Sequence, residues 1–354
     1  MRRPPRLVRD LHAGAHLDLF LVSAVASVLL IRFYLELTGY PSVGGATLHI
    51  AHMLWGGLLM LAALILLLAY LGRASRGWAA LLGGVGFGTF IDEVGKFVTR
   101  DHDYFFRPAV ALMYVVFIAA YMAGRTIRRR RVPVAEEYVV NALQELEQAA
   151  IHDLQPEERA RALDYLARVP PEHPLAAVLV RPLAALVGGL AVTPSRRPAL
   201  PQRVASAARR GYRRLTRHPV FWRALVVFFV AQLAFKLLHV LVLVLRPESG
   251  VTLAARVAFM GRNIDGYALP DWLQLGSSLV SALFTTAGIM ALARSHQRAL
   301  RHFQRSILVS VFVTQVFMFY RAQWEALVVL AFNLLVLAAL GYMRAHEAQD
   351  RLAA

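Results

Sequence analysis

Cysteine is absent from the 354 residues of this chain. Disulfide bonds, metal sites with cysteine ligands, iron–sulfur clusters and thiol nucleophiles are therefore all excluded. Lysine is almost absent as well, because 39 residues are basic and only Lys96 and Lys236 among them are lysines. This preference for arginine indicates a bacterial chain from a GC-rich genome. Both lysines fall inside apolar stretches, where a charge is costly and so marks a candidate for function.

Acidic residues are also few, with 22 of them against the 39 basic residues, and the net charge is +17. Such an excess is found in proteins that bind nucleic acid, but here the arginines flank apolar stretches. In that position they face anionic lipid on the cytoplasmic side of a membrane. We therefore expect membrane lipids, and no nucleic acid, as the partners of the basic segments.

Apolar residues make up 58% of the chain and its mean hydropathy is +0.50, which is too apolar for a soluble globular protein. Stretches of about 20 apolar residues match the thickness of the hydrocarbon core, where only hydrogen-bonded helices are stable. The sequence predicts an all-α integral membrane protein with about eight transmembrane helices. The predicted spans are 17–38, 49–71, 78–99, 105–124, 220–245, 270–293, 305–321 and 324–343.

Arginines concentrate in alternate loops between the predicted spans. The chain before the first span, the 72–77 loop, the long 125–219 segment and the 294–305 loop are basic, and the loops between them hold fewer basic residues. The positive-inside rule places basic loops in the cytoplasm. We therefore expect a multi-pass protein of the bacterial inner membrane, with both termini cytoplasmic and the first span acting as a start-transfer anchor.

Three parts follow from this pattern: a first four-helix membrane unit (1–124), a cytoplasmic helical insert with a basic linker (125–219) and a second four-helix unit (220–354). The insert predicts an amphipathic helix over 135–152 and a second helix capped by Asp153. From Ser195 to Trp222 there are eight arginines and no acid, so we expect this linker to bind anionic lipid. Loop lengths repeat between the two membrane units, which suggests an internal duplication.

Ionisable residues gather near the predicted outer ends of the spans. His49 and His52 open the second span, and Asp92, Glu93 and Lys96 lie near the end of the third. Further candidates are Asp101, His102 and Asp103 in the next outer turn, and Lys236 and His239 on the fifth span. The inner halves hold almost nothing comparable, which favours a site reached from one side of the membrane.

Each feature also has a structural interpretation. The histidines suit an interfacial position, and the acidic pair with Lys96 suits an ion pair that joins helices. Arg32 is expected to be neutralised by Glu36 four residues later. Gly84 and Gly88 form a GxxxG pattern, which predicts close helix packing and no nucleotide loop.

The leading functional hypothesis is a hydrolase or transferase that acts on a lipid or lipid-linked substrate. Glu93, beside Asp92, would be the general base and Lys96 an electrostatic stabiliser. His49 and His52, three residues apart, would hold a divalent metal or carry protons. The alternatives are an ion- or proton-coupled transporter and a non-catalytic assembly or sensor protein. The sequence leaves open whether the protein is an enzyme.

The runs HIAHMLWGG and GFGTFIDEVGKFVTRDHDYFFRPA stand within residues 47–124. They resemble a group of uncharacterised bacterial multi-pass membrane proteins. The resemblance implies a membrane location. That group has no assigned activity, so the resemblance implies no mechanism.

Overall fold

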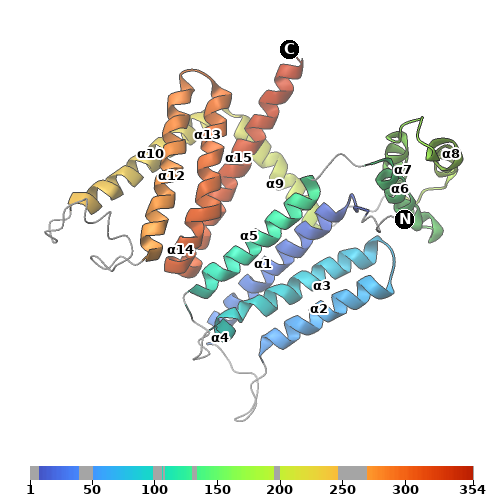
Figure 1. Cartoon of the computed structure of the whole chain (residues 1–354), viewed down its shortest axis with the longest axis horizontal. Coiled ribbons are helices and arrows are strands. Elements are labelled where there is room, and N and C mark those ends of the chain that lie inside the picture. Colours follow the sequence, from blue (N-terminus) through green and yellow to red (C-terminus); the bar gives the residue numbers. More distant parts are fainter. Residues whose placement is uncertain are drawn as a thin grey trace, which may run out of the picture. The chain divides into compact units, whose positions relative to one another are not determined.

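A computed structural model of the chain describes residues 8–39, 51–98, 106, 108–129, 134–194, 200–245 and 269–353. The ordered elements in these ranges are all helices (Figure 1). The all-α class predicted from the sequence is therefore confirmed. Contacts group the chain into two units, namely unit 1 (Met1–Tyr104 and Ala119–Pro198) and unit 2 (Phe105–Ile118 and Ala199–Ala354).

The membrane helices of unit 1 pack tightly because glycines line their contacts. They are α1 (Ala13–Thr38), α2 (His52–Ala69), α3 (Arg73–Asp92), the short α4 (Val94–Val98) and the second half of α5 (Pro108–Arg129). Helix α3 packs against both α1 and α2. A Cβ atom at Gly86 would lie 2.6 Å from the carbonyl oxygen of Gly56 on α2, and one at Gly88 would overlap the carbonyl oxygen of Ala24 on α1. The close packing predicted for Gly84 and Gly88 is confirmed.

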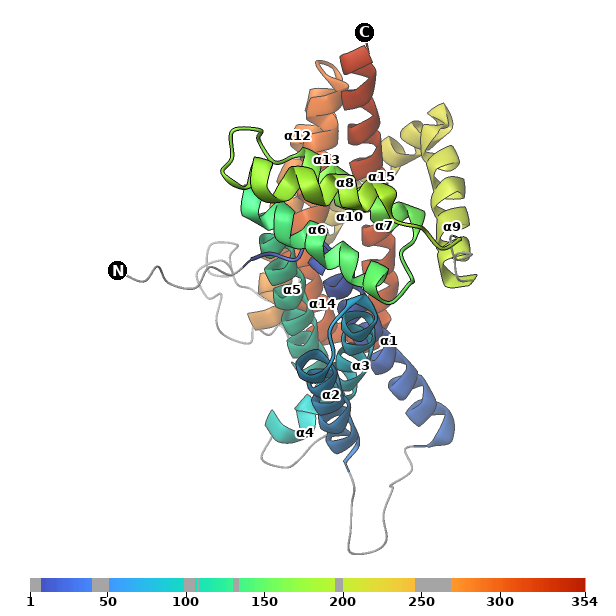
Figure 2. The same ribbon diagram turned by 90° about the vertical axis from the view of Figure 1, so that its right-hand side faces the viewer.

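The insert forms a small helical layer with its own apolar core. It contains α6 (Ala135–Ala150), α7 (Pro156–Ala167), the π-helical η1 (Ala176–Val180) and α8 (Arg181–Gly189), which lie together in Figure 2. Buried Val139, Ala142 and Val187 belong to one apolar cluster. The cap of α7 differs from the prediction, because the carboxylate of Glu158 accepts the Gln155 N–H at 3.0 Å. The N-cap of α7 is Gln155, two residues after the Asp153 that the sequence indicated.

The chain that precedes α1 is fastened to α6. Arg9 binds Glu137 at 2.9 Å, the Leu11 N–H donates to the side chain of Asn141 at 2.8 Å, and His12 bonds to Glu145. We call this set of contacts the N-terminal clasp.

The turn between α2 and α3 also contacts the insert and the chain that precedes α1. Arg73 binds Glu158 at 2.9 Å and Arg76 binds Asp10 at 3.0 Å. The start of α1, the α2–α3 turn and the insert thus lie together at one end of unit 1, which we call the insert end. The last turn of α3 and the first turn of α2 meet at the opposite end, which we call the distal end.

Unit 2 is a second helical bundle. It contains the first half of α5 with α9 (Leu200–Arg217), α10 (Pro219–Leu245), α12 (Leu269–Leu292), α13 (His296–Val309), the π-helical η2 (Ser310–Thr314), α14 (Gln315–Ala322), the short η3 (Gln323–Glu325) and α15 (Ala326–Ala353). The elements α13, η2 and α14 follow one another without a break, and the chain reverses at Gln323, whose φ is 46°. Helix α13 packs against α12 and α15.

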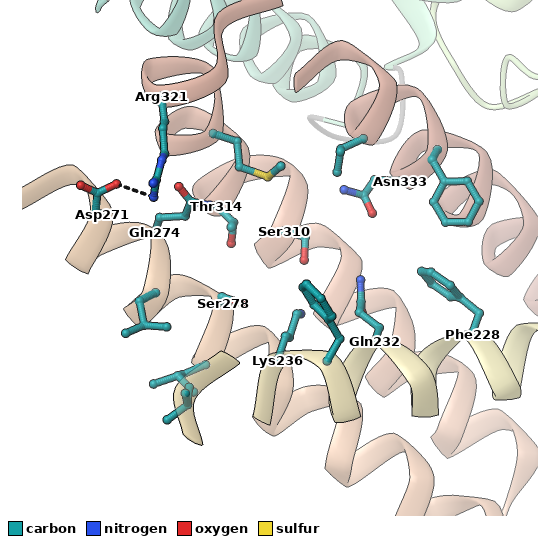
Figure 3. Close-up of a pocket in the computed structure, with 17 residues that line it drawn as sticks. Phe228, Gln232, Lys236, Asp271, Gln274, Ser278, Ser310, Thr314, Arg321 and Asn333 are labelled. Carbon is teal, nitrogen blue, oxygen red and sulfur yellow. Dashed lines mark hydrogen bonds and ion pairs between the residues drawn. The ribbon is translucent and has the colours of Figure 1, made fainter. Parts of the chain in front are cut away.

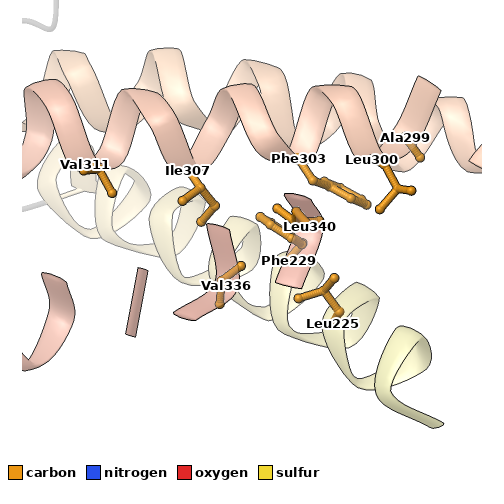
Figure 4. Packing of buried hydrophobic residues seen from close by; sticks show 9 residues of the cluster. All are labelled: Leu225, Phe229, Ala299, Leu300, Phe303, Ile307, Val311, Val336 and Leu340. Carbon is orange, nitrogen blue, oxygen red and sulfur yellow. The ribbon is translucent and has the colours of Figure 1, made fainter. Parts of the chain in front are cut away.

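An apolar cluster fills the part of unit 2 near the α12–α13 turn (Figure 4). The rings of Phe229 and Phe303 stack with their centroids 4.2 Å apart. Leu300, Ile307 and Leu340 are fully buried beside them. We call this set the floor cluster.

Six stretches are long and apolar enough to cross a membrane: Ala13–Thr38, His52–Ala69, Pro108–Ile127, Val220–Leu238, Leu269–Leu292 and His296–Arg344. Large apolar side chains such as Leu68 and Val328 are more than 70% exposed on them, as lipid-facing residues are. These helices indicate a chain that is embedded in a membrane and crosses it several times. Helix α3 is not among the six, since its first turn carries two arginines and its middle is glycine-rich. The number of about eight spans therefore stays a prediction.

Candidate functional site

Five ionisable side chains meet at the distal end of unit 1: Arg32, His52, Asp92, Glu93 and Lys96. We call them the charge cluster. Asp92 is fully buried, and the Arg32 guanidinium donates to its side chain at 2.6 Å and to its backbone carbonyl at 2.9 Å. His52 Nε2 lies 3.2 Å from the second carboxylate oxygen. The sequence led us to expect Glu36 as the partner of Arg32, whereas these contacts direct the guanidinium to Asp92 on α3.

Glu93 ends α3 and reaches the start of α2. Its side chain is 3% exposed, and one oxygen accepts the Met53 N–H at 2.9 Å. Its other oxygen lies 3.6 Å from Lys96 Nζ and 3.8 Å from His52 Nδ1. A carboxylate at the first turn of a helix satisfies a backbone donor that has no partner within the helix. The charge cluster therefore ties α1, α2 and α3 together.

Four predicted site residues are thus brought together, namely His52, Asp92, Glu93 and Lys96, and Arg32 joins them. Others lie outside the described residues: His49, Asp101, His102, Asp103 and the side chain of His239. Within the described ranges, no three His, Asp or Glu side chains are placed to hold a metal ion. The metal role of His49 and His52 and the catalytic role of Glu93 stay predictions.

Unit 2 contains a cavity of about 430 Å³, which we call the Lys236 cavity (Figure 3). It lies between α10, α12, the η2–α14 segment and α15. Polar side chains from all four line it: Gln232, Lys236, Asp271, Gln274, Ser278, Ser310, Thr314, Arg321 and Asn333. Apolar walls come from residues such as Phe228, Phe235 and Phe332.

Lys236 is held in place by hydroxyl groups. Its Nζ donates to Ser281 Oγ at 2.9 Å, and Ser281 lies 2.9 Å from the Ser306 hydroxyl and 3.0 Å from the Ser310 hydroxyl. In the part of the chain that the structure describes, no carboxylate pairs with this ammonium group. An ammonium group has three donors, so it keeps hydrogen-bonding capacity for a ligand in the cavity.

A π-helical turn forms one wall of the cavity. The η2 segment begins at Ser310 and ends at Thr314, and both side chains line the cavity. The Tyr114 hydroxyl donates to the Val311 carbonyl within this turn at 2.7 Å. π-Helical turns widen a helix locally and are frequent at functional sites. The Thr314 hydroxyl and the Gln232 carbonyl oxygen are buried with no hydrogen-bond partner among the described residues.

The two ends of the cavity differ. An ion pair between Arg321 and Asp271, 3.0 Å long, lies beside the α14–α15 turn, and the Arg321 side chain is 63% exposed. Toward the α12–α13 turn, the buried side chains of the floor cluster pack between α10, α13 and α15. The cavity is therefore polar and close to the surface at one end, and a buried apolar cluster of unit 2 lies toward the other end of its helices.

Sequence reasoning selected Lys236 but passed over Ser310, Thr314 and Asn333. A signal was present, because Ser306, Ser310 and Thr314 recur every four residues along one predicted span. That spacing places uncharged polar groups on one helix face. No protein-family model, curated protein sequence or solved structure matches the chain, so the functional argument depends on these residues themselves.

Proposed function

We propose that this chain is an eight-span protein of the bacterial inner membrane that binds a small ligand in the Lys236 cavity from the extracytoplasmic side. The observation that carries this function is a cavity of about 430 Å³ around an ammonium group that pairs with no carboxylate of the described residues. Its volume is in the range of ligand pockets. A cation inside a membrane is costly, so where one occurs it usually contacts water, an ion or a substrate.

The proposed topology is supported by contacts within unit 1. The N-terminal clasp joins the chain before α1 to the insert, so an even number of crossings must separate them. Four crossings by α1, α2, α3 and α5 satisfy this condition. In unit 2 Arg294 lies in the α12–α13 turn and Arg298 and Arg301 lie near the start of α13, which favours the cytoplasmic side for this end. The Lys236 cavity lies toward the other end of the same helices, and so toward the outside.

The floor cluster favours a one-sided site over a transport path. A transporter must expose its site to both sides in turn, so an inward path would have to open through Phe229, Phe303 and Ile307. A hydrolase or transferase on a lipid-linked substrate needs only the outer opening. Glu93 would have to leave its contacts to act as a base, since it is 3% exposed. We therefore place the ligand in the Lys236 cavity and not at the charge cluster.

The basic helix α9 belongs to the same proposal as a contact for anionic lipid. It carries arginines and no acid, and its Tyr212 hydroxyl donates to the Leu335 carbonyl of α15. Arg213 also lies over the ring of Tyr342. A helix held against α15 in this way can present Arg210 and Arg214, whose side chains are exposed, to headgroups at the cytoplasmic surface.

Single cysteines test the one-sided cavity, and the chain has no native cysteine to interfere. Ser278→Cys places a thiol on the cavity wall, and Ile307→Cys places one in the fully buried floor cluster. In intact cells, a membrane-impermeant maleimide should label position 278 from outside and leave position 307 unlabelled. After cell lysis and unfolding in detergent, both positions should react, which controls for expression.

Labelling of position 278 from the cytoplasmic side alone, in inverted vesicles, would overturn the topology. Labelling of position 307 in the folded protein under any ion or ligand condition would mean that the floor cluster becomes accessible to solvent. That result would favour a transporter.

A further inference from the structure

The chemistry of the Lys236 cavity allows its ligand to be described more closely, and this step rests on the proposed function. We infer that the ligand is a membrane lipid whose headgroup joins an anionic phosphate to hydroxyl donors, as a polyol phosphate does. Three independent features of the cavity lead to this class: its uncompensated charge, its unpaired acceptors and its apolar rim.

One of the charged groups that line the cavity has no partner of opposite charge among the described residues. Asp271 and Arg321 bind each other at 3.0 Å. Lys236 donates to the neutral hydroxyl of Ser281 at 2.9 Å, and no described carboxylate compensates its charge. An ammonium group in a low-dielectric site attracts an anion strongly, and phosphate oxygens accept hydrogen bonds from it. The ligand therefore carries negative charge.

Two buried oxygen atoms require hydrogen-bond partners as well. The Gln232 carbonyl oxygen and the Thr314 hydroxyl have none among the described residues, and both residues line the cavity. Thr314 is 8% exposed, so bulk water does not reach it freely. A buried amide oxygen can only accept, and leaving it unpaired costs about 1–3 kcal/mol. The ligand therefore also brings hydrogen-bond donors within reach of Lys236, and hydroxyl groups supply them without cancelling the negative charge.

The rim of the cavity is apolar and partly at the surface of unit 2. Phe235 is 72% exposed and Phe332 is 47% exposed, although both line the cavity. In a membrane-embedded bundle, such side chains face acyl chains. A lipid can therefore place its headgroup at Lys236 and leave its chains along these rings, whereas a free polyol phosphate would leave the rim uncovered.

The test uses the purified full-length chain in phosphatidylcholine nanodiscs, with bound lipid measured by native mass spectrometry. Phosphatidylglycerol supplies a phosphate with hydroxyl donors, and phosphatidylmethanol supplies the same charge without them. We expect the wild-type chain to prefer phosphatidylglycerol by about threefold or more. Free glycerol 1-phosphate, added alone, distinguishes a soluble source of the same group and should bind much more weakly.

Substitutions identify the residues that cause the preference for phosphatidylglycerol. Lys236→Met should weaken both anionic lipids at least about tenfold, and Lys236→Arg should retain them. Gln232→Leu should remove the preference for phosphatidylglycerol while leaving phosphatidylmethanol binding unchanged. Arg298→Met removes an exposed cation near the α12–α13 turn and is the matched control, because it should leave the preference for phosphatidylglycerol over phosphatidylmethanol unchanged.

Equal binding of the two anionic lipids by the wild-type chain would overturn the headgroup assignment. So would a Lys236→Met variant that binds as the wild type does. Binding of glycerol 1-phosphate with no bound lipid would overturn the lipid source. The accessibility of position 278 is measured independently of lipid binding. A wrong proposal about the one-sided cavity can therefore be distinguished from a wrong inference about the headgroup.

Discussion

At the scale of single residues, the charge cluster illustrates how a membrane bundle keeps a buried acid. The Asp92 side chain is fully buried and depends on Arg32 for its strongest contacts. Breaking a buried pair by removing one partner leaves an uncompensated charge and costs about 3–5 kcal/mol. We therefore expect Arg32→Met to lower the unfolding temperature strongly, as measured by thermal unfolding of the detergent-solubilised protein.

The control for this variant removes both charges. The double variant Arg32→Met, Asp92→Leu contains no unpaired carboxylate and should recover most of the lost stability. A double variant that is no more stable than Arg32→Met alone would contradict the view of this pair as a structural brace. It would point instead to a separate role for Asp92, such as the one predicted from the sequence.

The N-terminal clasp makes a pH-dependent contribution to stability. Burial raises the pKa of Glu145, but hydrogen bonds from His12 and Arg161 outweigh burial and lower it from 4.5 to about 2. A lowered pKa stabilises the folded state above the unfolded value, and this contribution disappears as the pH falls through about 2. The stability difference between the wild type and Glu145→Gln should therefore be present at pH 4.5 and shrink between pH 4.5 and 2.

The measurement for Glu145 is thermal unfolding of both proteins across that range. A difference that persists unchanged to pH 2, or one that already disappears near neutral pH, would contradict the expected behaviour. Arg168→Gln is a suitable control, because Arg168 contacts the exposed Asp164 and has no part in the clasp.

At the scale of elements, the close packing of α3 makes a clear prediction. A methyl group at Gly88 would overlap the backbone carbonyl of Ala24, which cannot rotate away as a side chain can. We expect Gly88→Ala to destabilise the protein by about 1–3 kcal/mol, as overpacking does. A Cβ at Gly57 would meet nothing within 4 Å, so Gly57→Ala should leave the unfolding temperature unchanged or raise it. Equal effects of the two variants would argue against tight α1–α3 contact.

The π-helical turn shows why sequence reasoning found only part of the candidate site. Lys236 stood out because a charge in an apolar stretch is costly, and the cost can be judged from one residue. Ser310 and Thr314 are uncharged and common in membrane helices, so neither was selected. Their direction depends on the extra residue in the turn η2, and no pattern in the sequence SVFVT predicts that turn.

At the scale of the whole molecule, long helices were predictable and their partners were not. Each predicted span overlaps helical residues, because hydropathy depends on neighbouring residues in the chain, although the third span covers α3 and α4 and the seventh covers α13, η2 and α14. The sequence favours Glu36 as the partner of Arg32 because it lies four residues away, whereas the structure also brings Asp92 to Arg32 from 60 residues away. The same limit applies to the N-terminal clasp, whose contacts join residues more than 120 positions apart.

That separation has a consequence for synthesis. His12 leaves the ribosome first, and Glu145 follows 133 residues later. At ordinary rates of translation, roughly ten seconds pass between the two. During this interval the first residues wait without their partners while the intervening helices enter the bilayer. Closure of the clasp therefore requires that those helices leave both ends of the segment in the same compartment.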